Sequence, residues 1–448
     1  MNLREMGLNL LPISIKAGGD ISDLPVLATK TWVHGPPKPR DLLRAEEIPE
    51  EDVSLDKISQ SLPFVRVLPM MEVQGLEDVG KIPLDEADAL IIRGGWGGKY
   101  SGERQVILNE LADLGKPILP SWDPFGYTWG RGGLNFGLEG YAPFSATEVK
   151  SLLRALRGWK ALRELKALYI GERPPSMTRP LDFADIQRHF GSLLFRRPFT
   201  EYKEAIANVH DDQAEALAAE WKEKYQILDE REQNLVNLAK VYLALKWMLA
   251  QSGANGLTVD CAFLPDVDLA PCFAFSLLID EGFPCGCEAD TGAHLTMVGL
   301  MGISGGPALM GNHWSNITHA DVEDNIIVIN HDVVPPSMGC QGCKLCLRDF
   351  HESGKGLTGY VELEKGQAVT VARLSDISME AWATVGEVMW TQDTAHCRTS
   401  IGIRVPDAKQ AFRCAVTDLE EHQVVAYGDY RDELSILYRM LDLEFEIL

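Results

Sequence analysis

The sequence of 448 residues predicts an α/β protein: two α/β segments, then a β-rich, barrel-like C-terminal segment. Two observations carry this prediction. Short apolar strand-like runs alternate with helical patterns through the first two thirds, and β-type runs separated by turns dominate beyond about residue 320. At roughly 100–200 residues per domain, the length allows two to four domains. We therefore expect domains at 1–160, 161–320 and 321–448.

The first segment contains strands, a glycine-rich turn and a helix. Apolar runs at 64–68 and 89–92 precede the turn Gly94 to Gly98, and a helical pattern covers 103–114. This order is typical of an α/β unit. The turn lacks the glycine spacing of a dinucleotide loop and the Walker lysine followed by serine or threonine. We favour a structural turn, or one that lines a cleft, over a nucleotide site.

The second segment alternates helices and strands. Apolar residues recur at three and four positions in its long helices, and either Asp290 or Thr291 is the expected N-cap of its last helix. The expected helices are 148–166, 211–225, 230–251, 270–279 and 291–302, and the expected strands are 167–171 and 256–263.

The third segment is dominated by β-type runs with turns between them. A helix with a short final strand closes the chain. The expected strands are 325–330, 359–363, 368–374 and 424–427, and the expected helix is 431–441.

The composition is that of a globular protein, with 46% apolar and 24% charged residues. Asp and Glu outnumber Lys and Arg by 65 to 42, giving a formal charge of −23. This charge repels phosphate backbones and anionic membrane surfaces, so neither nucleic acid nor a membrane is an expected partner. The N-terminal residues lack the pattern of a signal peptide, and a cytoplasmic location is expected.

Glu288 lies just before the predicted helix 291–302. Backbone N–H groups and the helix dipole at such a position favour an anion or a metal-bound carboxylate. A capping pair formed by Glu288 and Asp290 explains the same pattern equally well, so position alone leaves both interpretations open.

Three stretches resemble the L-fucose/L-arabinose isomerase superfamily, specifically its fucose-isomerase-like branch: CEADTGAHLTMVGLMGISGGPALMGN, FHESGKGLTGYVELEKGQAVTVARL and EEHQVVAYGDYRDELSILYRMLDLEFEI. The resemblance covers about 255–448. It implies two Rossmann-like domains before the β-rich domain, and a homo-oligomer, either trimer or hexamer. It also implies a Mn²⁺ or Mg²⁺ site with Glu288, Asn312 and His422 as ligands.

An isomerase of this kind interconverts aldose and ketose through an enediol. A divalent cation stabilises the charge on two adjacent sugar oxygens, and carboxylates move a proton between C1 and C2. Glu288 and Asp290 are the catalytic candidates. Asn312 stands where the family carries a carboxylate, and an amide can bind a cation but cannot act as a base. Glu288 acting alone, Asp290 or Asp332 as a second acid, and a different carbohydrate reaction such as a lyase step therefore remain open.

Two further residues are candidates for binding the sugar. Trp314 follows Asn312 closely and could stack on a sugar face, while His331 follows a predicted strand at a domain junction, where it could hydrogen-bond a hydroxyl. We expect no role in the site for His294 or His313.

The chain has nine cysteines, and Cys340, Cys343 and Cys346 are closely spaced. Three thiolates at this spacing can hold an iron–sulfur cluster or, with a fourth ligand, Zn²⁺. Cys285 and Cys287 are candidates for the fourth ligand, with Cys287 preferred, and free thiols in a loop are the alternative. A metal-thiolate or redox protein built on the same fold is therefore the competing functional class.

Overall fold

The computed structural model describes residues 2–15, 55–93, 102–119, 135–139, 141, 143, 145–172, 183–228, 232–264, 269–313, 319–350, 356–394, 397–415 and 422–448. The chain divides into two compact units, residues 7–153 and residues 1–6 with 154–448. The predicted boundary near 320 lies inside the larger unit, and the division into three domains stays a prediction. No helix in the described ranges is both long enough and apolar enough to cross a membrane.

The smaller unit is built on a parallel five-stranded sheet, with apolar side chains such as Ile13, Leu90 and Ile107 in its core. Strand order is β2-β1-β4-β5, with β3 also pairing β1. The predicted glycine turn at Gly94 to Gly98 lies outside the described residues. The strands are β1 (Leu8–Ile15), β2 (Val65–Val67), β3 (Met71–Val73), β4 (Ala89–Arg93) and β5 (Ile118–Leu119), and the helices are α1 (Leu55–Ser61), α2 (Leu76–Val79) and α3 (Gly102–Ala112).

The larger unit begins with a parallel four-stranded sheet of order β10-β9-β6-β7. Parallel strands need crossover connections, and helices supply them here. The strands are β6 (Lys166–Ile170), β7 (Leu193–Arg197), β9 (Gly256–Val259) and β10 (Cys285–Cys287). The helices are α4 (Ala146–Arg163), whose first residues belong to the smaller unit, α5 (Phe183–Phe190), α6 (Phe199–Ala207), α7 (Asp211–Lys224), α8 (Glu232–Ser252), α9 (Cys272–Asp280) and α10 (Thr291–Ser304).

Helix α10 is the central helix of the larger unit, and residues 291–303 are all buried. Asp290 caps it by accepting the Ala293 N–H at 2.9 Å, which confirms the predicted cap. Gly305 ends it in the left-handed conformation, at φ +71°. Glycines bring it close to α4, since a Cβ at Gly302 would lie 2.9 Å from the Cα of Gly158.

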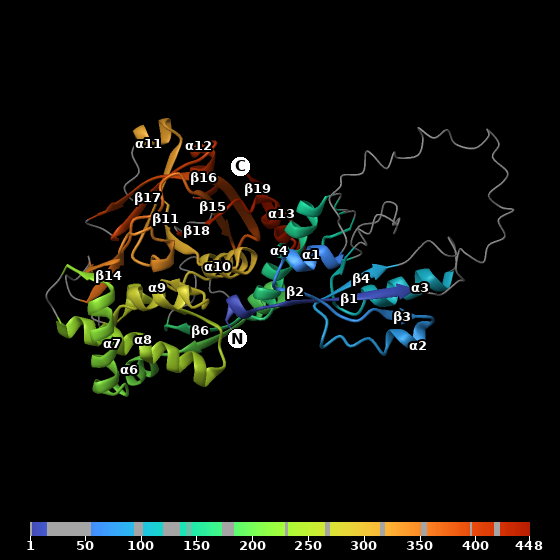
Figure 1. Cartoon of the computed structure of the whole chain (residues 1–448), viewed down its shortest axis with the longest axis horizontal. Helices are drawn as coiled ribbons and strands as arrows, with labels where there is room; N and C mark the ends of the chain where they lie inside the picture. Colours follow the sequence, from blue (N-terminus) through green and yellow to red (C-terminus); the bar gives the residue numbers. More distant parts are fainter. Residues whose placement is uncertain are drawn as a thin grey trace. The chain divides into compact units, whose positions relative to one another are not determined.

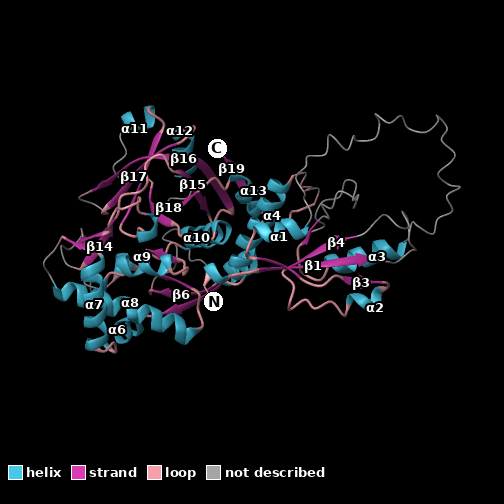
Figure 2. Ribbon diagram, viewed as in Figure 1, coloured by secondary structure: helices cyan, strands magenta, loops and turns pink. Residues whose placement is uncertain are grey.

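A six-stranded antiparallel barrel follows, in the order β15-β18-β11-β12-β17-β16, and pairing of β15 with β16 closes it. Helix α10 contacts barrel strands β15 and β18, below which it lies in Figures 1 and 2, and it also contacts β10 of the parallel sheet. The barrel strands are β11 (Leu309–Asn312), β12 (Ile326–His331), β15 (Ala368–Leu374), β16 (Glu380–Asp393), β17 (Thr399–Arg404) and β18 (His422–Tyr427).

Smaller elements surround the barrel. Strand β19 pairs with β16, and β14, β13 and β8 form a separate three-stranded sheet. These strands are β8 (Gln226–Ile227), β13 (Cys346–Asp349), β14 (Leu357–Tyr360) and β19 (Glu444–Ile447), and the helices are α11 (His319–Glu323), α12 (Ala408–Ala415) and α13 (Arg431–Met440). The α/β class and the barrel-like C-terminal region are thus confirmed, whereas the Rossmann-like character of the parallel sheets stays a prediction.

Candidate active site

Glu288 lies in the two-residue link between β10 and the cap of α10. Glu288 and Ala289 both adopt positive φ, at 55° and 59°. Two successive residues with side chains in this conformation are strained, and strain of this kind concentrates at functional sites. The Glu288 side chain stays 40% exposed, although the residues on either side of it are buried. The link therefore turns this carboxylate out of the core.

Two histidines from the barrel face the Glu288 carboxylate. His331 is the last residue of β12 and His422 is the first of β18, and their side chains are 3% and 6% exposed. Each Nε2 lies 3.8 Å from Glu288 Oε1. The three side chains offer ligand atoms that all lie within 4.8 Å of one another. Residues 134 positions apart in the chain thus meet at one point.

Asp290 and Arg373 hold His422 in place. Asp290 accepts two hydrogen bonds from Arg373, at 2.7 and 3.0 Å, and its Oδ2 lies 3.0 Å from His422 Nδ1. Burial alone would raise the pKa of Asp290, but the charges of Arg373 and His422 outweigh it and leave that pKa well below the usual range. The pKa of His422 is raised, because the bond to Asp290 and the charge of Glu288 outweigh burial.

The ionised Asp290 fixes the tautomer of His422. Its carboxylate can only accept, so Nδ1 of His422 carries the hydrogen. In neutral His422, Nε2 then carries a lone pair and faces the Glu288 carboxylate. This Nε2 has no hydrogen-bond partner within the described part of the chain. A carboxylate that orients a histidine in this way is typical of the residues behind a metal ligand.

His331 has the opposite arrangement. Its Nδ1 accepts the N–H of Asp332 at 2.8 Å, so the hydrogen of the neutral ring lies on Nε2. Binding a cation through Nε2 requires the ring to give up that contact. His331, predicted to bind sugar, thus lies within the ligand group itself.

The other predicted residues lie as follows. Asn312, on β11, is in register with His422 on one side and with Asn330 on the other. Trp314 lies outside the described residues. Asp332 is buried and its Oδ1 accepts the Arg398 N–H at 2.6 Å. His294 and His313 are buried as well.

Burial lowers the pKa of His294 and of His313 to about 4. Nε2 of His294 lies 3.1 Å from the Pro284 carbonyl oxygen, and neither histidine belongs to the ligand group found among the described residues.

The predicted thiolate cluster is only partly assembled. Cys340 and Cys343 are joined as a disulfide, whereas Cys346 Sγ lies 3.3 Å from Gln226 Oε1. Cys287 lies beside another cysteine, with its Sγ 3.1 Å from Cys261 Sγ and close to Glu288, and its expected role in the Cys340 cluster stays a prediction. Metal binding at Cys340 and Cys343 stays a prediction.

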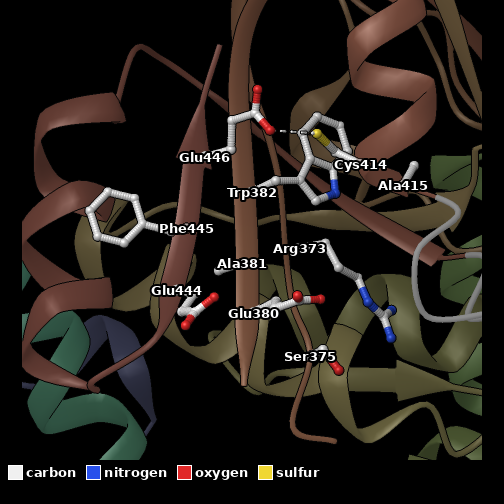
Figure 3. A pocket seen from close by; sticks show the side chains of 10 residues that line it. All are labelled: Arg373, Ser375, Glu380, Ala381, Trp382, Cys414, Ala415, Glu444, Phe445 and Glu446. Carbon is white, nitrogen blue, oxygen red and sulfur yellow. Dashed lines mark hydrogen bonds between the residues drawn. The ribbon is translucent and has the colours of Figure 1, made fainter. Parts of the chain in front are cut away.

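Arg373 also lines a cavity of about 280 Å³ between β16, β19 and α12 (Figure 3). Its wall is acidic, with Glu380, Glu444 and Glu446, and the figure shows the Cys414 thiol directed at Glu446. Neither Glu288 nor either histidine of the ligand group lines it. The cavity is therefore separate from the candidate active site.

Sequence reasoning overlooked Arg373 and the place of His331 among the possible ligands. The sequence around each of them gives an indication. Arg373 is a charged residue within the apolar run AVTVARL, and His331 ends the fully buried strand IIVINH. A buried charge needs a partner of opposite charge, and an imidazole at a buried strand end needs a polar one.

A barrel and a parallel sheet that meet at a carboxylate and two imidazoles define a candidate metal-binding enzyme. Residues 182–303 match the family model "L-arabinose isomerase central domain". This range contains Glu288 and Asp290 but neither histidine of the ligand group.

Curated relatives point the same way. The chain is 24% identical over 311 residues to sulfoquinovose isomerase of Priestia megaterium, covering 66% of this chain and 67% of that protein. It is 26% identical over 172 residues to L-arabinose isomerase of Arthrobacter sp., covering 36% and 34%. It is 31% identical over 125 residues to L-arabinose isomerase of Thermotoga maritima, covering 26% and 25%. These relatives are sugar isomerases of the arabinose isomerase type and support an aldose–ketose isomerase; the fucose-isomerase-like branch is not confirmed.

Proposed function

We propose that this protein is a metal-dependent aldose–ketose isomerase. The observation that carries the proposal is the convergence of Glu288 with the Nε2 atoms of His331 and His422, each 3.8 Å from Glu288 Oε1. One carboxylate and two imidazoles suit Mn²⁺ or a similar divalent cation. The unpartnered Nε2 of His422 fits such an ion. Asn312, next to His422 across the strands, is the proposed source of a carbonyl oxygen ligand.

When bound, the cation would supply Lewis-acid stabilisation of the negative charge that develops on adjacent sugar oxygens. Glu288 is the proposed base. One of its oxygens faces the imidazoles, which leaves the second oxygen to take the proton from one carbon and return it to the next.

Asp290 has a positioning role in this proposal. It is buried, and its carboxylate already accepts from Arg373, the Ala293 N–H and His422. These contacts favour a structural carboxylate over the second catalytic acid suggested by sequence. Asn312 cannot take that role either, since an amide is not a base. Glu288 therefore acts alone as the carboxylate that transfers the proton.

The test is proton exchange in D₂O with added Mn²⁺, on a panel that includes sulfoquinovose, L-arabinose and L-fucose. Deuterium should enter the position next to the carbonyl with at least one sugar. Glu288→Gln should reduce the rate by about 10²–10⁴-fold, the usual contribution of a general base. Glu223→Gln, a change at an exposed site on α7, is the matched control. Exchange that persists in Glu288→Gln, or no exchange with any sugar, contradicts the proposal.

A further inference from the structure

Three cysteines beside the candidate active site have no part in the proposed isomerisation. Cys261 follows β9, Cys287 ends β10, and Cys272 begins α9. Strands β9 and β10 are parallel neighbours with Val259 and Cys287 in register, so Cys261 and Cys287 leave the sheet at the same edge. Cys261 and Cys287 are 26 residues apart in the sequence, and the pairing of β9 with β10 brings them together.

The thiols of Cys261 and Cys287 contact each other and Glu288. The two Sγ atoms are 3.1 Å apart, and the Glu288 N–H donates to Cys261 Sγ at 3.3 Å. Both Sγ atoms and a Glu288 carboxylate oxygen lie within 4.8 Å of one another. Glu288 therefore belongs to two groups of possible ligands, one with two imidazoles and one with two thiols.

More sulfur surrounds this pair. The Cys287 N–H lies 3.1 Å from Met310 Sδ. Cys272 and Cys287 are 3% and 1% exposed, while Cys261 is half-buried and therefore more accessible to solvent than the other two. A sulfur-rich environment of this kind favours soft and borderline cations over Mn²⁺ or Mg²⁺.

We propose that Cys261, Cys287 and Glu288 form a second metal site, for a borderline-soft divalent cation such as Zn²⁺. Binding forms two metal–sulfur bonds and one metal–oxygen bond, and the two thiols release two protons to solvent. Tetrahedral zinc with Zn–S bonds of about 2.3 Å places two sulfurs about 3.8 Å apart. The pair needs to open by less than about 1 Å, which side-chain rotation of the half-buried Cys261 can supply.

The second site has a consequence for the first because both use Glu288. A cation held by the thiols binds a Glu288 oxygen, which is then no longer available to the site formed with His331 and His422. Zn²⁺ in this position therefore inhibits proton transfer and weakens Mn²⁺ binding. This consequence rests on the proposed function, whereas the existence of the thiol site does not.

Co²⁺ is the probe, because its bonds to thiolates give a charge-transfer band in the near ultraviolet. The full-length protein, purified without oxygen, should develop this band up to one equivalent of Co²⁺ per chain and lose it when Zn²⁺ is added. Cys261→Ser should weaken Co²⁺ binding at least about tenfold, because one of three ligands is lost. Cys287→Ser should do the same, and Cys261→Ala gives a second test at the more accessible position.

Three controls separate this site from others. Cys346→Ser and the double variant Cys340→Ser/Cys343→Ser should retain the band, since those cysteines lie elsewhere. The double variant His331→Ala/His422→Ala should retain it too, even where isomerase activity and Mn²⁺ binding are lost. No band in the unaltered protein, or a band that survives in both Cys261→Ser and Cys261→Ala, overturns the proposal. Loss of the band in Cys340→Ser/Cys343→Ser assigns the thiolates to the other pair and also overturns it.

Discussion

The carboxylate of Asp290 lies 3.0 Å from Nδ1 of His422, and this contact determines which nitrogen of His422 faces Glu288. Arg373 completes the arrangement by binding both oxygens of Asp290 and the backbone carbonyl of His422, at 2.7 Å. The Arg373 guanidinium thus holds the cap of α10 and the start of β18 together. The geometry of the candidate site depends on this buried ion pair.

Asp290→Asn should weaken Mn²⁺ binding about 10–100-fold, the usual effect of losing the group behind a metal-binding histidine. Protons compete with the cation for His422, whose pKa is raised by Asp290, so Mn²⁺ affinity of the unaltered protein should fall as the pH drops through that raised pKa. The variant should show this fall at lower pH. Calorimetric Mn²⁺ titrations between pH 5 and 8 measure both effects, and an unchanged pH profile would contradict the assigned contact.

His422→Ala should reduce Mn²⁺ affinity more than His331→Ala does. In neutral His422, Nε2 already carries the lone pair that binds a cation. His331 must lose the hydrogen bond from the Asp332 N–H before its Nε2 can bind the cation. We expect a difference of at least about tenfold in dissociation constant, or about 1.4 kcal/mol. Equal losses would show that the tautomer of the metal-free protein does not decide affinity. His189→Ala, a change on α5, is the control.

Much of this site was predictable from sequence, and the limits have physical causes. Helix α10 was expected at 291–302 with Asp290 as a possible cap, and it runs over 291–304 with that cap, because capping is a local interaction. Glu288 and His422 were paired through a resemblance. No local sequence pattern predicts that His422, at the start of β18, lies beside Glu288, which is 134 residues earlier in the chain.

The strands were less predictable where pairing rather than composition creates them. Strand β10 consists of Cys-Gly-Cys, residues with little intrinsic preference for strands, and exists because β9 lies beside it. The contact of Cys287 with Cys261 was not predictable for the same reason, since it depends on the register of β9 and β10. Spacing along the chain predicts only contacts between neighbours in sequence.

Asp376 should make the protein less stable as the pH rises. Burial raises its pKa to about 6, against about 3.9 in the unfolded chain. Because the pKa is raised in the folded state, Asp376 stabilises the fold relative to high pH. This contribution to the unfolding free energy is fully present below about pH 4 and is lost as the pH rises through about 6. By pH 7 the loss is up to about 3 kcal/mol.

Asp376→Asn removes this dependence, because an amide stays neutral at every pH. Urea unfolding at pH 4 to 7 should show the unfolding free energy of the unaltered protein falling relative to that of the variant. The exposed carboxyl of Asp324 provides the control, Asp324→Asn, which should keep the dependence. Parallel curves for the unaltered protein and Asp376→Asn would refute the prediction.

Gly302→Ala should destabilise the larger unit by about 1–3 kcal/mol, the usual cost of overpacking. The added Cβ would meet Ala161 Cβ at 2.8 Å and the Cα of Gly158 at 2.9 Å, and backbone atoms of α4 cannot move aside cheaply. Gly306→Ala is the matched control, since its nearest neighbour would be Ser304 Oγ at 3.9 Å. Thermal unfolding of the two variants gives the comparison, and equal melting temperatures would rule out the tight contact of α10 with α4.

Asn312→Asp should strengthen Mn²⁺ binding about tenfold, a change of about 1.4 kcal/mol. The strand register places residue 312 beside His422, and a carboxylate there adds a negative charge and a second oxygen that can bind the cation. Asn208→Asp adds the same charge at the exposed end of α6 and should leave Mn²⁺ affinity unchanged, which separates a local ligand from a general change in net charge. A variant with unchanged or weaker Mn²⁺ binding would remove residue 312 from the proposed ligand set. If binding tightens and deuterium exchange also accelerates, the added carboxylate shares proton transfer with Glu288, and the amide of the natural sequence limits the rate of the unaltered enzyme.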